Sequence, residues 1–127
     1  MTGALDIYLT ESQHQEQVIL WCDHEAPVLI RRQTAQILAI PNGGHRNKAV
    51  AGRLKAEGVR PGVPDLFLPV PAGPFHGLWI ELKKMGGRPS AEQIQRLAEL
   101  RANGYRAVIA VGWREAVAII SDYLGQP

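Results

Sequence analysis

The spacing of apolar and polar residues along the chain predicts four helices and four strands. Helices are expected over residues 11–24, 46–57, 90–103 and 114–124, and strands over residues 35–40, 65–70, 78–84 and 105–111. The predicted order is therefore helix, strand, helix, strand, strand, helix, strand, helix. The sequence shows no internal repeat and no low-complexity segment that would suggest another organisation.

Local signals mark where these elements begin and end. Thr10 with Gln13, and Ser90 with Gln93, fit the capping box, in which two side chains bond each other's backbone N–H groups at a helix start. Three glycines are placed to end helices. They are Gly58, Gly104 and Gly125.

Two connections predict how the strands pair. The segment between strands 65–70 and 78–84 is rich in Pro and Gly, which is typical of a hairpin loop and makes these strands antiparallel. Residues 78–111 form a strand, a helix and a strand, which is long enough for a right-handed parallel crossover. The sequence therefore predicts a mixed sheet with helices on both faces, in the α/β class.

Length and composition limit the class of protein. The chain has 127 residues, 46% hydrophobic and 20% charged, so we expect a single globular domain over residues 1–127. Apolar runs such as Val18–Cys22 are far shorter than the ~20 residues that span a bilayer, and no signal peptide is evident, so no membrane partner is expected. Cys22 is the single cysteine, which fits a reducing cytoplasm.

Charge is distributed unevenly along the chain. Residues 1–30 carry a net charge of −5, residues 31–60 carry +6 and the remainder carries +1, giving +2 in total. A basic central block favours a polyanionic partner such as nucleic acid, with a solvated charged helix as the alternative. No phosphate-binding Walker loop or GxSxG motif is present, so neither a nucleotide cofactor nor serine-hydrolase activity is expected.

Charged residues interrupt one of the apolar strands. Glu81 and Lys83 are two positions apart and point to the same face of strand 78–84. Asp65 begins the neighbouring strand, so its carboxylate can lie beside that of Glu81. Two close carboxylates repel each other, and a divalent cation removes this conflict. A structural ion pair between Glu81 and Lys83 is the alternative.

Such a site fits the hydrolysis of a phosphodiester. A bound cation polarises a phosphate and lowers the pKa of a water molecule. Lys83 can then position or deprotonate that water, or neutralise charge that develops on the phosphate. The four histidines show no metal-ligand spacing and are interpreted as ordinary residues.

Pro64-Asp65 followed by Glu81-Leu82-Lys83 resembles the signature of the PD-(D/E)XK nuclease superfamily. The wider pattern is similar to the VRR-NUC family, chiefly its small stand-alone members from phages and prophages. The resemblance covers nearly the whole chain and rests on several motifs in the right order. They are Pro41-Asn42-Gly43-Gly44 followed by Arg46-Asn47, the run from Gly58 to Asp65, Glu81-Leu82-Lys83, the run from Ser90 to Gln93 and the run from Leu100 to Tyr105.

The resemblance implies a restriction-endonuclease-like fold and a set of metal ligands. Asp65 and Glu81 would hold Mg²⁺ or Mn²⁺ with the backbone carbonyl of Leu82, and a glutamate of the first helix would be a further ligand. Glu11 is favoured because it shares a helical stripe with apolar residues of the expected core. Glu16 lies off that stripe and is the alternative, and a charge that only stabilises the helix N-terminus is the other interpretation of Glu11.

The resemblance also implies polar and basic residues around the metal. Gln93 would be an active-site residue near Lys83, unless its role is only to close the capping box. The turn of Asn42, Gly43 and Gly44 would lie beside the active site, unless it serves only as a turn. Five cations are expected to contact the DNA backbone, and the alternative is that they are only solvated surface charges. They are Arg46, Lys48, Arg53, Lys84 and Arg88.

As an activity, the resemblance implies structure-selective cleavage of branched DNA by a metal-dependent endonuclease, with four-way junctions as the leading substrate. Paired cuts in two strands need two sites, so a homodimer is expected. The cytoplasm would be that of a bacterial host if a phage encodes the chain. A nuclease for flap, nicked or duplex DNA, a non-catalytic DNA-binding module and an interaction module without nucleic acid are the alternatives.

Overall fold

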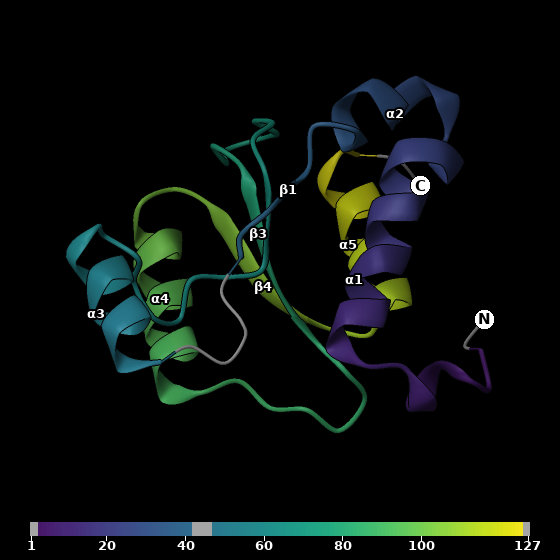
Figure 1. The fold of residues 1–127 in the computed structure, drawn as a ribbon. Helices are drawn as coiled ribbons and strands as arrows, with labels where there is room; N and C mark the ends of the chain where they lie inside the picture. The colour runs from purple at the N-terminus through teal and green to yellow at the C-terminus, as the bar shows by residue number, and fades with distance from the viewer. Residues whose placement is uncertain (1–2, 42–46, 126–127) are drawn as a thin grey trace.

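The computed structural model describes residues 3–41 and 47–125, which form a sheet with helices on two sides (Figure 1). In these ranges the helices are η1 (Asp6–Tyr8), α1 (Glu11–Leu20), the π-helix η2 (Trp21–Glu25), α2 (Val28–Thr34), α3 (Lys48–Ala56), α4 (Ala91–Ala102) and α5 (Trp113–Tyr123). The strands are β1 (Leu38–Ala39), β2 (Leu66–Leu68), β3 (Leu78–Lys83) and β4 (Arg106–Val111). The predicted mixed α/β architecture is confirmed.

The sheet has the predicted strand pairing. Over the described ranges its order is β1-β2-β3-β4, with β2 antiparallel to both β1 and β3, and β4 parallel to β3. The chain passes from β3 to β4 through α4, which makes the expected crossover. One row of directly paired residues runs across all four strands. It consists of Leu38, Phe67, Trp79 and Ala107.

The hydrophobic core lies on one face of this sheet. Figure 1 shows α1 and α5 on that side, and α3 and α4 on the other. Val18 of α1 and Ile120 of α5 pack with strand residues such as Leu66, and all three are fully buried. None of the helices within residues 3–41 and 47–125 combines the length and apolar character that a membrane crossing requires.

Side chains alternate along strand β3, so its core residues point to one face of the sheet and its charged residues to the other. Leu78, Ile80 and Leu82 belong to the core. Glu81 therefore points to the opposite face, where its side chain meets Gln93 beside α4. Lys83 shares this face, and its ammonium lies 3.4 Å from the carboxylate of Glu81.

The segment after α1 differs from the prediction. The chain passes through η2 into α2, a helix that is absent from the predicted order. Thr34 at the end of α2 is buried, and its hydroxyl donates to the carbonyl of Cys22 at 2.6 Å, which holds α2 against η2. Because Ala35 caps α2, the strand predicted over residues 35–40 is reduced to Leu38–Ala39.

The N-terminal segment is attached to α5 by polar contacts. Arg114 donates from Nε to the Asp6 carboxylate at 2.8 Å. Burial by itself raises the pKa of Asp6, but the hydrogen bond and the charge of Arg114 outweigh burial and hold this pKa below its ordinary value. His14 of α1 is fully buried, and its Nδ1 accepts the Trp113 backbone N–H at 3.1 Å. These contacts connect the start of α1 with the start of α5.

Candidate active site

Asp65 and Glu81 come together where β2 begins beside β3. Leu66 pairs with Ile80, so Asp65 precedes β2 at the level of Glu81. The Asp65 carboxylate accepts the backbone N–H of Leu82 at 2.8 Å, which fixes its side chain against β3. The two acidic residues that the sequence places sixteen positions apart therefore share one corner of the sheet.

Glu81 is almost completely buried, with 1% of its surface exposed. Its Oε2 accepts a hydrogen bond from Gln93 Nε2 at 3.1 Å and lies 3.4 Å from Lys83 Nζ. Its Oε1 is also buried but has no hydrogen-bond partner among the described residues. A buried carboxylate oxygen without a partner is costly unless something else occupies its coordination position.

The pKa of Glu81 also shows that its charged form is disfavoured at this position. Burial and, after it, the charge of nearby Asp65 raise the pKa of Glu81 to about 8, and Lys83 opposes this rise only in part. A divalent cation at the two carboxylates would favour the charged form of Glu81 and supply a partner for its Oε1. The residues present therefore fit a hard, oxygen-preferring cation.

Gln93 closes the capping box that the sequence predicts, and it also contacts the candidate site. Its Oε1 accepts the backbone N–H of Ser90 at 2.8 Å and its backbone N–H donates to the Ser90 hydroxyl at 3.2 Å, which completes the capping box of α4. Its Nε2 is left to donate to Glu81. The start of α4 thereby fixes the orientation of the Glu81 carboxylate.

A pocket of about 240 Å³ lies beside Asp65, and residues of helix α1 form part of its wall. Glu11, Asp65 and Leu82 all contribute to its walls. Glu16 lines a different hollow on the outer side of α1, so the geometry favours Glu11 over Glu16. Ser12 and Gln15 also line the pocket and were not predicted as site residues. Gln15 could have been indicated by its position four residues after Glu11 on the same helical face, whereas the spacing gives no such signal for Ser12.

The main chain of Leu82 faces the same pocket. The carbonyls of Gly77 and Lys83 accept N–H groups from Arg106 and Gly112, so alternate residues of β3 direct their backbone groups toward β4. Leu82 directs its groups the opposite way, past the start of β2. Its N–H bonds to Asp65, and its carbonyl is directed to the same side.

Carboxylates alone do not complete a metal site. Within residues 3–41 and 47–125, no three His, Cys, Asp or Glu side chains are close enough together to hold an ion. Glu11 therefore lines the pocket but does not form a close cluster with Asp65 and Glu81. An ion at the pair would need the Leu82 carbonyl, solvent or substrate oxygens for its remaining positions.

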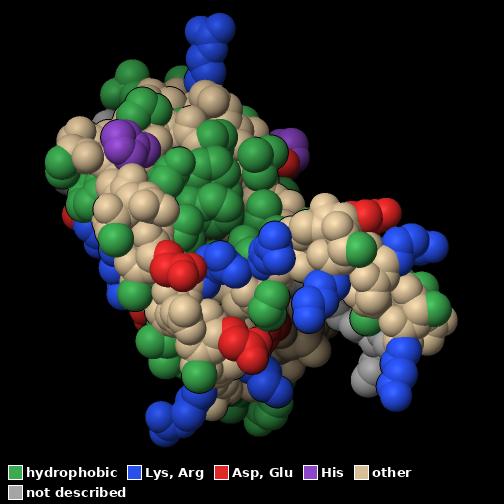
Figure 2. Space-filling model, turned by 90° about the vertical axis from the view of Figure 1, so that its left-hand side faces the viewer, with side chains coloured by type: hydrophobic (Ala, Val, Ile, Leu, Met, Phe, Trp, Pro, Cys, Tyr) green, Lys and Arg blue, Asp and Glu red, His purple; other side chains and the backbone are tan. Residues whose placement is uncertain are grey.

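The predicted DNA-contact residues are spread around the site. Lys48 and Arg53 are exposed on α3, and Lys84 and Arg88 are exposed in the segment between β3 and α4. Figure 2 shows Lys and Arg side chains distributed over the face that carries α3 and α4. Asn42, Gly43, Gly44 and Arg46 lie outside the described residues, so their predicted roles are not addressed by the structure.

Known proteins resemble this chain in sequence and in fold. The family model of the VRR-NUC domain matches residues 9–113. A solved structure described as "VRR_NUC domain protein" is 31% identical, with a TM-score of 0.78 over 92% of this chain and 89% of that chain. No match is found among curated proteins.

Proposed function

The chain belongs to the VRR-NUC family, whose members are nucleases of the PD-(D/E)XK type, and from this premise we propose that it is a metal-dependent endonuclease that hydrolyses phosphodiester bonds in DNA. The observation that carries the proposal is the buried Glu81 carboxylate with half-buried Asp65 and buried Lys83 beside it. Burying like charges together is unfavourable for a purely structural pair, whereas it suits a site that receives a cation.

Asp65 and Glu81 would hold Mg²⁺ or Mn²⁺ together with the carbonyl of Leu82, and Glu11 would add a ligand from the pocket wall. The ion would polarise the phosphate and lower the pKa of the attacking water. The N–H of Leu82 keeps Asp65 in place, and Gln93 keeps Glu81 in place. The protein therefore orients both carboxylates before any substrate arrives.

Lys83 supplies a positive charge at the reacting phosphate. Its side chain is 10% exposed and its ammonium is held near Glu81, so it has little freedom to move away. From this position it orients the attacking water or neutralises charge that develops on the phosphate oxygens. In-line attack of water forms a new P–O bond and breaks the P–O bond to one strand; the attacking water loses a proton, and the departing strand oxygen takes one up.

The exposed cations on α3 and after β3 support DNA as the partner, because they can contact phosphates without reading bases. We extend the proposal to branched DNA, with four-way junctions as the first substrate. The described residues contain one such site, so cutting two strands needs two copies, and a twofold homodimer is the simplest assembly.

The experiment that tests this function is cleavage of a labelled four-way junction beside linear duplex and flap DNA, in Mg²⁺, Mn²⁺ and EDTA. We expect metal-dependent paired nicks in the junction that are lost in Asp65→Ala and Lys83→Ala. Arg32→Ala, an exposed cation of α2 that lies outside the predicted DNA contacts, is the control for Lys83 and should retain the activity. Glu11→Ala and Glu16→Ala, on the same helix, test which glutamate serves the site.

Each result separates one part of the proposal from another. Cleavage of flap or duplex alone keeps the chemistry and replaces the substrate. Binding without cleavage in either metal contradicts the enzyme and leaves a DNA-binding module. Equal activity of wild type and Lys83→Ala contradicts the role assigned to Lys83.

A further inference from the structure

Aromatic side chains form a cluster on the face of the sheet that also carries Glu81. Phe67 and Trp79 stack with ring centroids 4.2 Å apart and an interplanar angle of 22°. Tyr105 meets both rings edge-on, at centroid distances of 6.0 and 6.3 Å. Leu38, which is 51% exposed, belongs to the same row of the sheet. We call Leu38, Phe67, Trp79 and Tyr105 the aromatic face.

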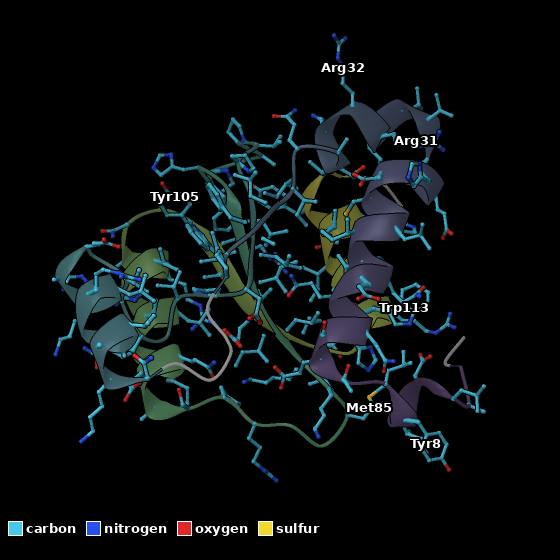
Figure 3. All side chains as sticks on the ribbon, in the orientation of Figure 1. Tyr8, Arg31, Arg32, Met85, Tyr105 and Trp113 are labelled. Atoms are coloured by element: carbon cyan, nitrogen blue, oxygen red, sulfur yellow. The ribbon has the colours of Figure 1, made fainter. Side chains whose placement is uncertain are left out.

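The aromatic face is partly accessible, with its three rings half-buried and Leu38 exposed, and it has cations at its border. Figure 3 shows Tyr105 at the end of the sheet, on the side of α3 and α4. Figure 2 shows a broad apolar area on this side of the molecule, bordered toward the helices by Lys and Arg side chains with an acidic one among them. Tyr105 also lines a hollow of about 300 Å³ together with Arg101 and Arg106.

The aromatic face leads directly into the candidate active site. Trp79, Glu81 and Lys83 follow one another on one face of β3, about 7 Å apart at each step. Phe67 of β2 and Asp65, just before β2, are likewise two positions apart. A ligand that lies on the rings is therefore directed toward half-buried Asp65, beside the buried Glu81 carboxylate.

Aromatic rings on a sheet face with cations beside them match the chemistry of single-stranded nucleic acid. Unpaired bases stack on such rings, and their phosphates meet the cations. The bases of intact duplex are already stacked on each other and cannot use the rings. A second copy of this chain fits less well, because a twofold contact would place the bordering cations of both copies against each other.

We propose that the aromatic face binds unpaired nucleotides next to the phosphodiester bond that is cut. This inference rests on the proposed endonuclease function and narrows its substrates to DNA with a single-stranded segment beside the cleavage point. Branched DNA that carries such a segment is then cut in preference to a fully paired four-way junction.

The test begins with binding in EDTA, so that it does not depend on cleavage. Tryptophan fluorescence is titrated with an oligothymidylate of about 12 nucleotides, within the range that one single-strand site covers. We expect quenching in the wild type and in Trp113→Phe, and loss of most quenching in Trp79→Phe. Affinities are measured for all variants by the fluorescence anisotropy of a dye-labelled oligothymidylate. Trp79→Leu, which keeps an apolar side chain but not the ring, should bind about tenfold more weakly, while Trp79→Phe should bind within about twofold of wild type.

A second variant and a second readout protect the test against misfolding. Tyr105→Leu should weaken oligothymidylate binding in the same direction, and circular dichroism should show that each variant is folded. If Trp79→Leu and wild type bind the oligothymidylate with equal affinity, the inference is overturned. The proposed cleavage of duplex or junction DNA is not contradicted by that result. A change from dimer to monomer in Trp79→Leu, with unchanged oligonucleotide affinity, would overturn it in favour of a contact between copies.

Discussion

A Cβ atom placed on Gly62 would lie 2.5 Å from the carbonyl oxygen of Glu92, so the loop before Asp65 rests directly on the first turn of α4. Gly62 also has a φ of +78°, which disfavours any other residue. Gly62 lies only three positions before Asp65 in the sequence. The position of Asp65 relative to Glu81 therefore depends on a residue without a side chain.

Gly62→Ala should reduce both stability and endonuclease activity. Gly58 is the matched control, because its φ is +101° but an added Cβ would meet nothing within 4 Å. We expect Gly58→Ala to cost about 1 kcal/mol of unfolding free energy and to retain activity. Gly62→Ala should cost at least ~2 kcal/mol, because the loop must also move away from α4. Urea unfolding and cleavage rates measure this, and equal effects of the two variants would contradict the positioning role.

Gln93→Glu should separate helix capping from the site. Glutamate can still accept the Ser90 N–H, so α4 should keep its stability within about 0.5 kcal/mol. It cannot donate to Glu81 and adds a third carboxylate, so cleavage should fall by more than about tenfold. Ser90→Ala is the reverse case, with a stability loss of about 1 kcal/mol and little loss of activity. Full activity of Gln93→Glu would show that the contact with Glu81 is only structural.

Glu81→Gln should stabilise the metal-free protein while abolishing cleavage. The pKa of Glu81 in the folded protein, about 8, lies above its ordinary value of 4.5, so the folded state binds the proton more tightly. Stability is therefore lost as the pH rises from 4.5 through about 8, and Glu81→Gln escapes this loss. We expect a gain on the order of 1 kcal/mol at pH 9 in EDTA. Denaturant unfolding at pH 6 and pH 9 measures this gain, with Glu99→Gln as an exposed control. If Glu81→Gln is less stable than wild type at pH 9, the Glu81 carboxylate serves the fold.

Asp6→Asn should lower the melting temperature at neutral pH. The pKa of Asp6 is lowered in the folded state, so its ionised form contributes stability above the ordinary value of 3.8, and this is lost as the pH falls below that value. The difference from wild type should thus shrink in acid. Asp122→Asn is the control, because its pair with Arg106 is 3.9 Å long and its side chain is 75% exposed. Melting curves between pH 7 and pH 3 test this, and a difference that does not change with pH would contradict it.

The Cys22 thiol should be unreactive in the folded protein. Burial raises its pKa to about 12, with a smaller contribution from the charge of Asp23. Little thiolate is therefore present at pH 8, and the side chain is fully buried in the core. A colorimetric thiol reagent should react only on unfolding, with guanidinium-denatured protein as the control. Rapid reaction under native conditions would show that η2, which carries Cys22, opens readily.

Much of the fold could be predicted because its signals are local. The capping boxes at Thr10 and Ser90 form as predicted, and the strands of the hairpin pair as predicted. Helix α2 was missed because its start, Pro27, makes no side-chain cap and its end is fixed by a contact of Thr34 with a distant carbonyl. Such tertiary contacts leave no periodic pattern in the sequence.

The candidate site shows the same division. The placement of Asp65 beside Glu81 follows from the hairpin, and that of Lys83 follows from strand alternation. The distance between Glu11 and the carboxylate pair depends on how α1 packs on the sheet, which spacing alone does not determine. The contact of Gly62 with α4 was likewise not predicted, because it joins two segments thirty positions apart.

The alternation of side chains along β3 determines both the core and the candidate site. Its odd positions carry the polar residues of the site and its even positions carry the core, so a shift of one residue would exchange the two. An insertion or deletion within β3 therefore removes the fold together with the chemistry. Descendants of this chain that lose the chemistry but still fold must arise by point substitution, with the length of β3 retained.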